Sequence, residues 1–232
     1  MQPIQIDKEK LTLDDVVAIA RLNCPVQSSP EGDRRVERTR ALVDEWVAEK
    51  KVIYGITTGF GALCNVPISE ADTRQLQHKI IMSHAAGIGA PLPEDVVRAV
   101  MAVRLHDLFM GYSGCSLKTL QYLTAFLNEG LTPVVPEKGS VGSSGDLAPM
   151  AHLGLVLLGK GEAFYNSIRM NGSRALAKID LEPLELSAGE GLALINGTQV
   201  MTGIASLVVH DAIRLAKLAD IACAMSLEVL MG

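Results

Sequence analysis

The sequence has few of the residues on which several classes of protein depend. Aromatic side chains make up only 4% of its 232 residues, so the core must consist mostly of aliphatic side chains and methionine. Four scattered cysteines form no CxxC pair and no histidine–cysteine cluster at zinc spacing. They are typical of reduced thiols in a cytoplasmic protein. The sequence therefore predicts neither a disulfide framework nor a metal site.

Basic charge and targeting signals are also scarce. The net charge of −5 argues against nucleic acid as a main partner, because phosphate binding needs a basic face. The N-terminus lacks the basic-then-apolar order of a signal peptide. Residues 191–209 are uncharged and long enough to cross a bilayer, but they contain Asn196 and Gln199 and lack basic flanks. We interpret this stretch as a helix buried on all sides in a protein or oligomer, not in a membrane.

Helical patterns dominate what is present. Capping boxes at Thr12/Asp15 and Ser69/Asp72, a cap at Asp146 and a stop at Gly130 predict helices. The predicted helices lie near residues 12–20, 34–51, 69–84, 94–110, 117–128, 146–158 and 187–230. Residues 163–170, before Asn171-Gly172, predict a short hairpin, and 52–54 a short extended piece. We expect a mainly α fold with few short strands, a loop-rich N-terminal domain (1–185) and the start of a long-helix bundle (186–232).

Glycine- and serine-rich loops interrupt this helical scaffold, and such loops commonly carry function. The most informative segment, residues 139–149, reads Gly-Ser-Val-Gly-Ser-Ser-Gly-Asp-Leu-Ala-Pro. It is not a phosphate-binding loop, because no Gly-Lys-Ser/Thr follows and Asp146 would repel a phosphate. It also lacks the Gly-x-Ser-x-Gly spacing of a nucleophile elbow. On composition alone, a plain turn into a capped helix explains it.

Three other positions have both an ordinary and a functional interpretation. Tyr54 lies in a glycine-rich loop, where a tyrosine is ordinarily a packing residue. Ser83-His84 ends a predicted helix, where a histidine is ordinarily structural. Asn196 and Gln199 lie in the uncharged stretch, where an unpaired amide costs on the order of 2–7 kcal/mol, so that hydrogen-bonded core amides are the ordinary interpretation.

Together these segments resemble the motifs of the aromatic amino acid ammonia-lyases, in the family's order and spacing. The signature Gly-Ser-Val-Gly-x-Ser-Gly-Asp-Leu-Ala-Pro matches 139–149, and the tyrosine loop Tyr-Gly-x-x-Thr-Gly-Phe-Gly matches 54–61. The Leu-Asn-Gly-Thr-Gln motif matches 195–199, with Ile195 in place of Leu. We identify the chain as a member of this family, and the resemblance covers nearly its whole length.

The resemblance implies an electrophilic group made from the chain itself and no external cofactor. In the family, the x-Ser-Gly triplet cyclises to 4-methylidene-imidazol-5-one with loss of two waters. Here the Gly145 nitrogen would attack the Ser143 carbonyl, and Ser144 would supply the methylidene carbon. A glycine suits the attacking position, because a side chain would hinder closure of so tight a ring. The family usually has Ala where Ser143 stands, but only its backbone carbonyl enters the ring, so we expect cyclisation to survive.

The resemblance also implies roles for the other candidates. Tyr54 would act as the base at the β-carbon, in a glycine loop that includes Gly61 and closes over the substrate. Ser83 and His84 would lie under the substrate side chain, and Asn196 against the ring. Ser-His resembles the histidine-specific members, whereas His-Leu goes with tyrosine and Phe-Leu with phenylalanine. The expected reaction is conversion of L-histidine to urocanate and ammonia.

Two alternatives stay open: a tyrosine or phenylalanine ammonia-lyase or aminomutase, and a catalytically silent assembly module. Family members are longer homotetramers whose C-terminal part supplies an arginine for the substrate carboxylate. The chain ends at Gly232 within a predicted helix, so we expect an N-terminal half that self-associates and needs the missing half. If the chain worked alone, Arg98 and Arg104 would be the first candidates to bind the carboxylate.

Overall fold

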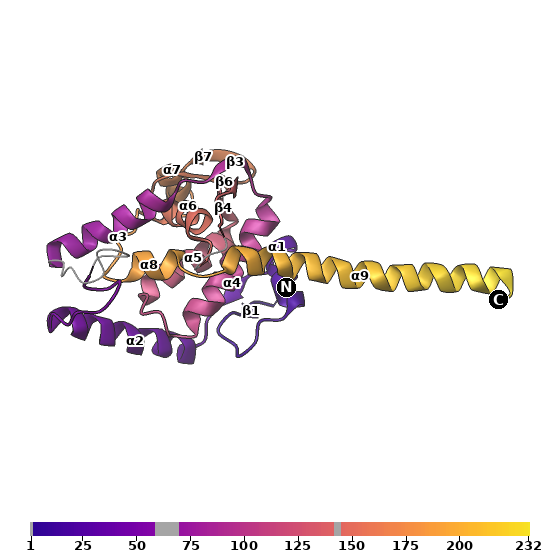
Figure 1. The fold of residues 1–232 in the computed structure, drawn as a ribbon, viewed down its shortest axis with the longest axis horizontal. Helices are drawn as coiled ribbons and strands as arrows, with labels where there is room; N and C mark the ends of the chain where they lie inside the picture. Colours follow the sequence, from indigo (N-terminus) through magenta and orange to yellow (C-terminus); the bar gives the residue numbers. More distant parts are fainter. Residues whose placement is uncertain (1, 59–69, 142–144) are drawn as a thin grey trace.

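The computed structural model describes residues 2–58, 70–141 and 145–232 and shows a helical body from which one long helix projects (Figure 1). The helices are α1 (Leu13–Arg21), α2 (Pro30–Ala48), α3 (Glu70–His84), α4 (Glu94–Phe109), α5 (Leu117–Glu129), α6 (Leu147–Leu157), α7 (Gly172–Ala177), α8 (Glu190–Ile195) and α9 (Gln199–Leu230). The strands are β1 (Ile4–Gln5), β2 (Val26–Gln27), β3 (Ile88–Pro91), β4 (Leu131–Pro133), β5 (Pro136–Lys138), β6 (Glu162–Tyr165) and β7 (Ile168–Asn171). The predicted mainly α class with few short strands is confirmed.

Local capping chemistry explains where most helices begin and end. The Thr12 hydroxyl accepts a hydrogen bond from the Asp15 N–H, and Asp15 accepts from the Thr12 N–H, which confirms the first capping box. Gly130 ends α5 in the left-handed conformation at φ 70°, as predicted. Helix α2 begins at Pro30, earlier than predicted, because Ser29 caps it and a proline suits its first turn.

The strands form three small sheets at the edges of the body. Strands β4, β6 and β7 pair antiparallel in the order β4-β6-β7, β3 pairs antiparallel with β5, and β1 pairs parallel with β2. The hairpin predicted within 163–170 is present, and its turn is Asn166-Ser167, where both residues have positive φ, as a type I′ turn requires. Asn171 instead caps α7 by accepting from the Arg174 N–H at 2.9 Å. Residues 52–54 are not a strand, and Tyr54 begins a turn.

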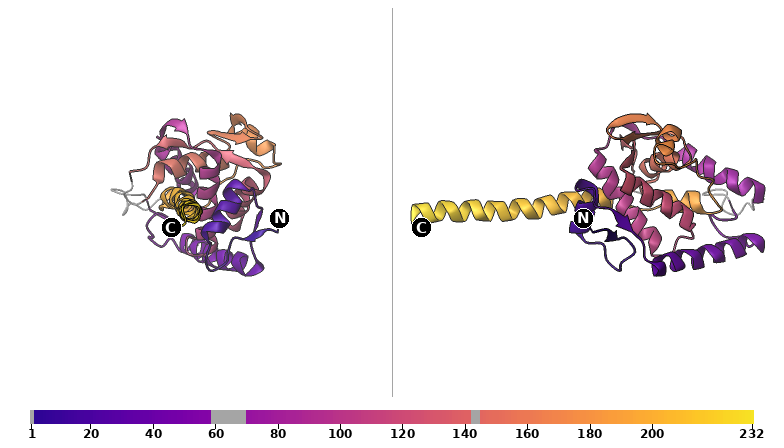
Figure 2. Two further views of the ribbon diagram at one scale, coloured as in Figure 1. Left: turned by 90° about the vertical axis from the view of Figure 1, so that its right-hand side faces the viewer. Right: turned by 180° about the vertical axis from the view of Figure 1, so that it is seen from behind.

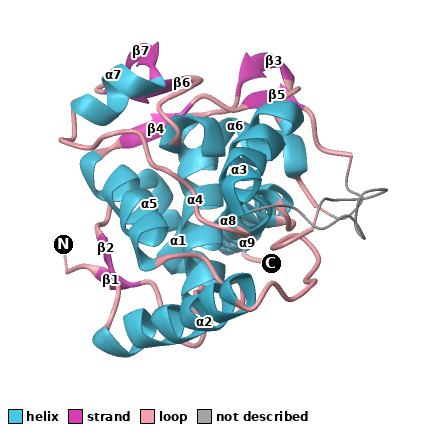
Figure 3. Ribbon diagram, turned by 90° about the vertical axis from the view of Figure 1, so that its left-hand side faces the viewer, coloured by secondary structure: helices cyan, strands magenta, loops and turns pink. Residues whose placement is uncertain are grey.

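Helix α4 lies at the centre of the body and contacts α1, α2, α5 and α9. Figure 3 shows the other helices arranged around α4, α8 and the start of α9. The core is mostly aliphatic, as the composition predicts, and Phe109 and Phe126 are the largest of its fully buried side chains. At Gly203, an added Cβ would lie 2.9 Å from the Val100 backbone nitrogen, so a glycine lets α9 approach the α4 backbone.

The uncharged stretch 191–209 is not one continuous helix. Helix α8 ends at Ile195, Asn196 is its C-cap, and α9 begins at Gln199. Helix α8 packs against α3 and α6 inside the body, whereas α9 leaves the body after its first turns (Figure 2). Within this chain the start of α9 is buried on one face, not on all sides, because α4 covers Val200 and Gly203 while Met201 and Ile204 are exposed.

None of the helices in the described ranges is both long and apolar enough to cross a membrane. The division of the chain into 1–185 and 186–232 stays a prediction.

Candidate active site

The C-terminal end of the predicted ring-forming triplet lies against the predicted ring-supporting turn. Gly145 forms an isolated parallel β-bridge with Gly197, and the Asp146 N–H donates to the Gly197 carbonyl at 2.6 Å. Gly145 has φ 113°, and an added Cβ would lie 2.2 Å from the Gly197 carbonyl oxygen. Only glycine fits this contact. The predicted ring closure favours glycine at the same position, because a side chain would hinder it. Three predicted site residues lie outside the described residues: Gly61, Ser143 and Ser144.

Asp146 ties this contact to the start of α9. Its side chain is fully buried, and its carboxylate accepts hydrogen bonds from the Ser140 hydroxyl at 2.6 Å and the Met201 N–H at 2.9 Å. Met201 is in the first turn of α9, where free N–H groups and the helix dipole favour a carboxylate. We predicted that Asp146 caps α6. It does occupy the N-cap position there, but its side chain makes no cap hydrogen bond to α6 and instead caps α9.

A buried carboxylate holds the N-terminal end of α8. Glu190 accepts from the Ser116 N–H and hydroxyl, each at 2.8 Å, from the Thr119 hydroxyl at 2.6 Å and from the Ser187 N–H at 2.6 Å. Ser187 and Glu190 are therefore paired at the start of α8, where Gly189 is the N-cap. The carboxylate lies at the N-termini of both α5 and α8, where two helix dipoles stabilise it.

A buried guanidinium holds the other end of α8. Arg104, on α4, is 2% exposed and donates to the carbonyls of Leu194 at 3.1 Å, Asn196 at 2.6 Å, and Ala193. It also donates to the Asp107 carboxylate at 2.9 Å. Burial lowers the pKa of this guanidinium, and the nearby acidic groups oppose that shift. A helix of six residues is not stable alone, so these end contacts and packing determine where α8 lies.

Both arginines considered for the substrate carboxylate are committed to backbone carbonyls. Arg98 donates to the Ile19 carbonyl at 2.9 and 3.2 Å and to the Leu127 carbonyl at 3.1 Å. Burial lowers the pKa of Arg98, as it does for Arg104. Neither guanidinium can bind a substrate carboxylate without giving up these bonds, and each would leave buried carbonyls unsatisfied.

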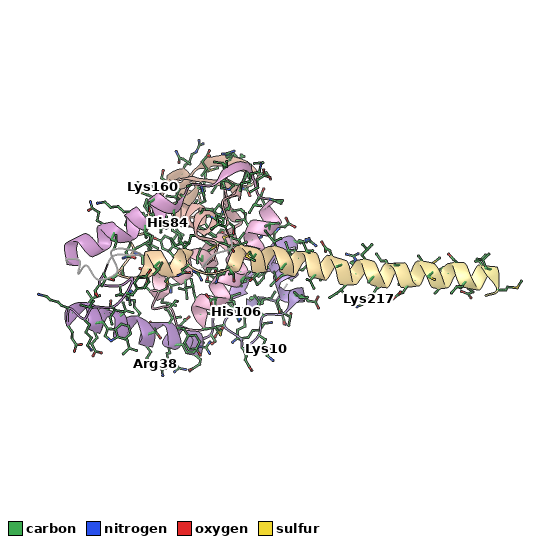
Figure 4. All side chains as sticks on the ribbon, viewed as in Figure 1. Lys10, Arg38, His84, His106, Lys160 and Lys217 are labelled. Atoms are coloured by element: carbon green, nitrogen blue, oxygen red, sulfur yellow. The ribbon has the colours of Figure 1, made fainter. Side chains whose placement is uncertain are left out.

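The predicted substrate pair ends α3, where Ser83 is exposed and His84, labelled in Figure 4, is half-buried. The His84 Nδ1 lies 2.8 Å from the Ile80 carbonyl, and the Ser83 hydroxyl donates to the same carbonyl at 3.0 Å. Because a carbonyl only accepts, Nδ1 carries the proton in this contact. In the tautomer that carries its proton on Nδ1, Nε2 is a hydrogen-bond acceptor.

The segment after His84 contacts the loop that leads into the triplet. The Gly87 N–H donates to His152 Nε2, on α6, at 3.0 Å. A Cβ on Gly139 would lie 3.2 Å from the Gly87 Cα, so the two loops touch. Burial lowers the pKa of His152, which keeps the imidazole neutral and able to accept this bond at neutral pH. The predicted substrate pair is therefore anchored beside the predicted cofactor loop.

Tyr54 lies at the opposite end of α8 from Asn196. Its turn contacts the start of α8, because a Cβ on Gly189 would lie 3.2 Å from Ile56 Cγ1. Six helical residues rise about 9 Å, which separates the two ends of α8. Tyr54 is 56% exposed, so it is not a core packing residue. Asn196 is also exposed, and the buried amide of the pair is Gln199, which donates to Asp107 at 3.2 Å.

Sequence reasoning missed the positioning roles of Arg104, Glu190 and His152. The local signal was a charge inside an apolar helix, since Arg104 follows Met101-Ala102-Val103 and precedes Leu105. Such a charge is almost never buried without a partner. The partners could not be found from the sequence, because the carbonyls that Arg104 contacts lie about ninety residues further along the chain.

Comparison with known proteins identifies the family to which a chain with this fold belongs. A family profile described as aromatic amino acid lyase matches residues 11–232. The chain belongs to the aromatic amino acid lyase family. It is 52% identical over 229 residues to a histidine ammonia-lyase of Streptococcus gordonii, an alignment that covers 99% of this chain and 45% of that protein. The chain thus spans about half the length of the curated relatives it matches.

Solved structures of the family show the same fold. A histidine ammonia-lyase from Trypanosoma cruzi aligns with a TM-score of 0.92 at 35% identity, over 100% of this chain and 44% of that one. A tyrosine aminomutase from Streptomyces globisporus aligns with a TM-score of 0.90 at 37% identity, over 95% of this chain and 41% of that one.

Proposed function

We propose that the protein containing this chain is an ammonia-lyase that converts L-histidine to urocanate and ammonia. The observation that carries the proposal is the contact of Gly145 and Asp146 with Gly197, which brings the last residue of the proposed ring-forming triplet to the Asn196 turn. The curated relatives with 50–52% identity are named histidine ammonia-lyase, which supports the substrate.

The triplet Ser143-Ser144-Gly145 supplies the cofactor in this proposal. Cyclised to methylidene-imidazolone, it provides an electrophile, which ordinary side chains cannot. The described end of the triplet suits this role, because the cradle around Gly145 has no room for a Cβ. Asp146 and Ser140 hold the loop on either side, and the N-terminus of α6 adds positive potential beside it.

Tyr54 is the proposed base. Its phenol oxygen would take the proton from the substrate β-carbon, and its exposed position in a turn leaves it accessible to a bound molecule. The glycine loop that follows, including Gly61, would close over the substrate and exclude water. Asn196, held through its backbone by Arg104, would support the ring from the other end of α8.

Histidine selection is assigned to Ser83 and His84. The Nδ1 bond to Ile80 leaves Nε2 as an acceptor, and an imidazole N–H of the substrate is a suitable donor. A phenyl ring offers no such donor. A tyrosine hydroxyl does, and a tyrosine aminomutase is among the similar structures, so a tyrosine lyase or aminomutase of the same family is the second candidate.

We propose that the protein acts in the cytoplasm as a homotetramer. The part of the relatives' length that this chain does not span would complete it. Beyond the body, α9 exposes a series of large apolar side chains: Val208, Val209, Ile213, Leu215, Leu218, Ile221, Met225, Leu227, Val229 and Leu230. An apolar surface of this extent on a chain marks an interface. We infer that further copies and the C-terminal half cover it, and that the 232-residue chain alone does not turn over histidine.

Purified full-length protein supplied with single amino acids tests the assignment. Urocanate and cinnamates absorb in the near ultraviolet, whereas a β-amino acid does not. We expect urocanate from histidine, with a kcat/KM above that for tyrosine or phenylalanine. A higher kcat/KM for tyrosine would favour the second candidate, and formation of a β-amino acid would identify an aminomutase. A protein with an intact ring and no activity on any of them would be a silent module.

A further inference from the structure

Arg104 makes an unusual set of contacts for a residue outside the family motifs. It is buried in the middle of α4, and its donors converge on the carbonyls that end α8. The last carbonyls of a helix have no partner within the helix and carry the negative end of its dipole. A planar guanidinium with several diverging donors can satisfy them together, whereas an ammonium group cannot match that geometry.

The same contacts span the break between α8 and α9. On one side Arg104 bonds the Asn196 carbonyl, and on the other its ion-pair partner Asp107 accepts from Gln199, the first residue of α9. Gly197, one of the two residues between Asn196 and Gln199, accepts a hydrogen bond from the Asp146 N–H and touches Gly145. The path of this turn, and hence the position of Gly145, depends on contacts made from α4.

We propose that Arg104, assisted by Asp107, is a positioning residue for formation of the prosthetic ring. The inference rests on the proposed function, because it presumes that the triplet cyclises. By fixing the Asn196-Gly197 turn, Arg104 sets the surface against which Gly145 is held while its nitrogen approaches the Ser143 carbonyl carbon. Arg104 touches no reacting atom and acts through the backbone of the turn.

The step that it positions is balanced and needs no oxidant. A bond forms between the Gly145 nitrogen and the Ser143 carbonyl carbon. The carbonyl oxygen leaves as water with the amide hydrogens of Gly145 and Ser144. The Ser144 hydroxyl leaves as a second water with the Ser144 α-hydrogen. Because the reacting atoms belong to residues only two positions apart, their approach is set by the backbone, and a misplacement of about 1 Å can slow such a step roughly 10²-fold.

Arg98 provides a matched control on the same helix. It is also buried, and it also donates to backbone carbonyls, which lie near the ends of α1 and α5, at Ile19 and Leu127. Arg104 differs in donating to the Asp107 carboxylate as well. Replacing either arginine by lysine keeps the charge and loses the divergent donors. A general loss of stability should affect both variants, whereas a positioning role affects the ring only at Arg104.

The experiment compares the full-length protein with its Arg104→Lys, Arg98→Lys and Asp107→Ala variants. Mass spectrometry of the peptide containing residues 143–145 measures the fraction that has lost two waters, and thermal unfolding measures stability. We expect complete cyclisation in the unmodified protein and in Arg98→Lys. In Arg104→Lys the uncyclised peptide should be the main species, and in Asp107→Ala a smaller uncyclised fraction should appear without a fall in stability.

The outcomes separate the two proposals. An uncyclised unmodified protein would contradict the proposed function itself. A fully cyclised Arg104→Lys, or equal loss of the ring in Arg98→Lys at the same stability, would overturn the positioning role alone. If Arg104→Lys gives no folded protein, Asp107→Ala decides, because Asp107 is exposed and its removal should leave the fold intact. Complete cyclisation in that variant would then overturn the inference.

Discussion

The last part of the chain contains two segments of similar apolar character and opposite surroundings. The inner segment (190–207) is held by buried charged side chains of the body, Arg104 and Asp146, and by its own Glu190. The outer segment (208–232) leaves the body, and Figure 4 shows Lys217 on its projecting part. Near the start of this segment, the Asp211 carboxylate accepts hydrogen bonds from Arg21 of the body at 2.6 and 2.8 Å.

The difference shows what apolar sequence alone does not specify. In the inner segment, hydrogen bonds from charged groups end one helix and start the next, so the chain's own residues determine its path. In the outer segment, beyond Asp211, the apolar side chains are exposed, and the described residues of the body offer no such hydrogen bonds. The inner segment is therefore where we place the proposed site, and the outer segment is where we propose that the chain meets other polypeptide.

The largest effect is expected from Gly145→Ala, which breaks the contact that defines the inner segment. The new Cβ would lie 2.2 Å from the Gly197 carbonyl oxygen, which is backbone and cannot move away cheaply. Ring formation and turnover should both be lost. Gly130→Ala is the control, because Gly130 also has positive φ but its Cβ would meet nothing within 4 Å. It should cost only about 1–2 kcal/mol of backbone strain and leave the peptide at 143–145 cyclised.

Tyr54→Phe should lower turnover by roughly 10²-fold or more, in line with the contribution of a general base. The side chain is exposed and its hydroxyl is the only group removed, so thermal stability and ring formation should not change. Steady-state kinetics combined with peptide mass tests both parts. Near-normal turnover would show that another residue removes the proton.

Exchange of Ser83-His84 should change substrate preference more than total activity. His-Leu or Phe-Leu at these positions removes the Nε2 acceptor, so kcat/KM for histidine should fall relative to tyrosine or phenylalanine. Competition between paired amino acids measures the ratio directly. An unchanged ratio would mean that other residues read the substrate side chain.

The same substitution at Leu207 and at Leu218 compares the inner and outer segments directly. Leu207 is 3% exposed and Leu218 is 53% exposed. Leu207→Glu places a charge in the inner segment and should destabilise the fold by several kcal/mol, on the scale of an unpaired buried charge. Leu218→Glu should leave unfolding of the body within about 0.5 kcal/mol and instead weaken self-association, measured by light scattering. Equal association of Leu218→Glu and the unmodified protein would contradict an interface at this position.

The smallest effect concerns pH. Burial lowers the pKa of His152 below its ordinary 6.5, so the folded protein binds this proton less tightly than the unfolded chain. The stability contributed by neutral His152 is complete above pH 6.5 and is lost as pH falls toward the lowered pKa. In His152→Gln, thermal unfolding should lose part of its pH dependence below pH 6.5. A curve parallel to that of the unmodified protein would show that His152 does not contribute.

Much of the fold could be predicted because helix signals are local. The Thr12/Asp15 box, the end of α5 at Gly130 and the extent of α4 all depend on residues within a few positions of one another. Errors arose where two local signals compete. Asn171-Gly172 is typical of a turn beside the predicted hairpin, but Asn171 instead caps α7.

The motifs of the candidate site could be predicted from the sequence, but the contacts that hold them in place could not. The motifs that contain Tyr54, His84, Gly145 and Asn196 are strings of neighbouring residues, and the roles of these four residues stay predictions. The bonds that hold them join residues far apart, such as Asp146 with Met201 and Gly87 with His152. A carboxylate beside a helix start has an obvious local use, and only the folded chain shows that Asp146 serves a different helix.

The most direct test of the account is the mass of the peptide that contains residues 143–145 in the purified, full-length protein. The account predicts a mass lower by two water molecules, and Ser144→Ala, which lacks the departing hydroxyl, should not show the full loss. A peptide of three ordinary residues in the unmodified protein would contradict the self-formed ring and, with it, the proposed ammonia-lyase chemistry.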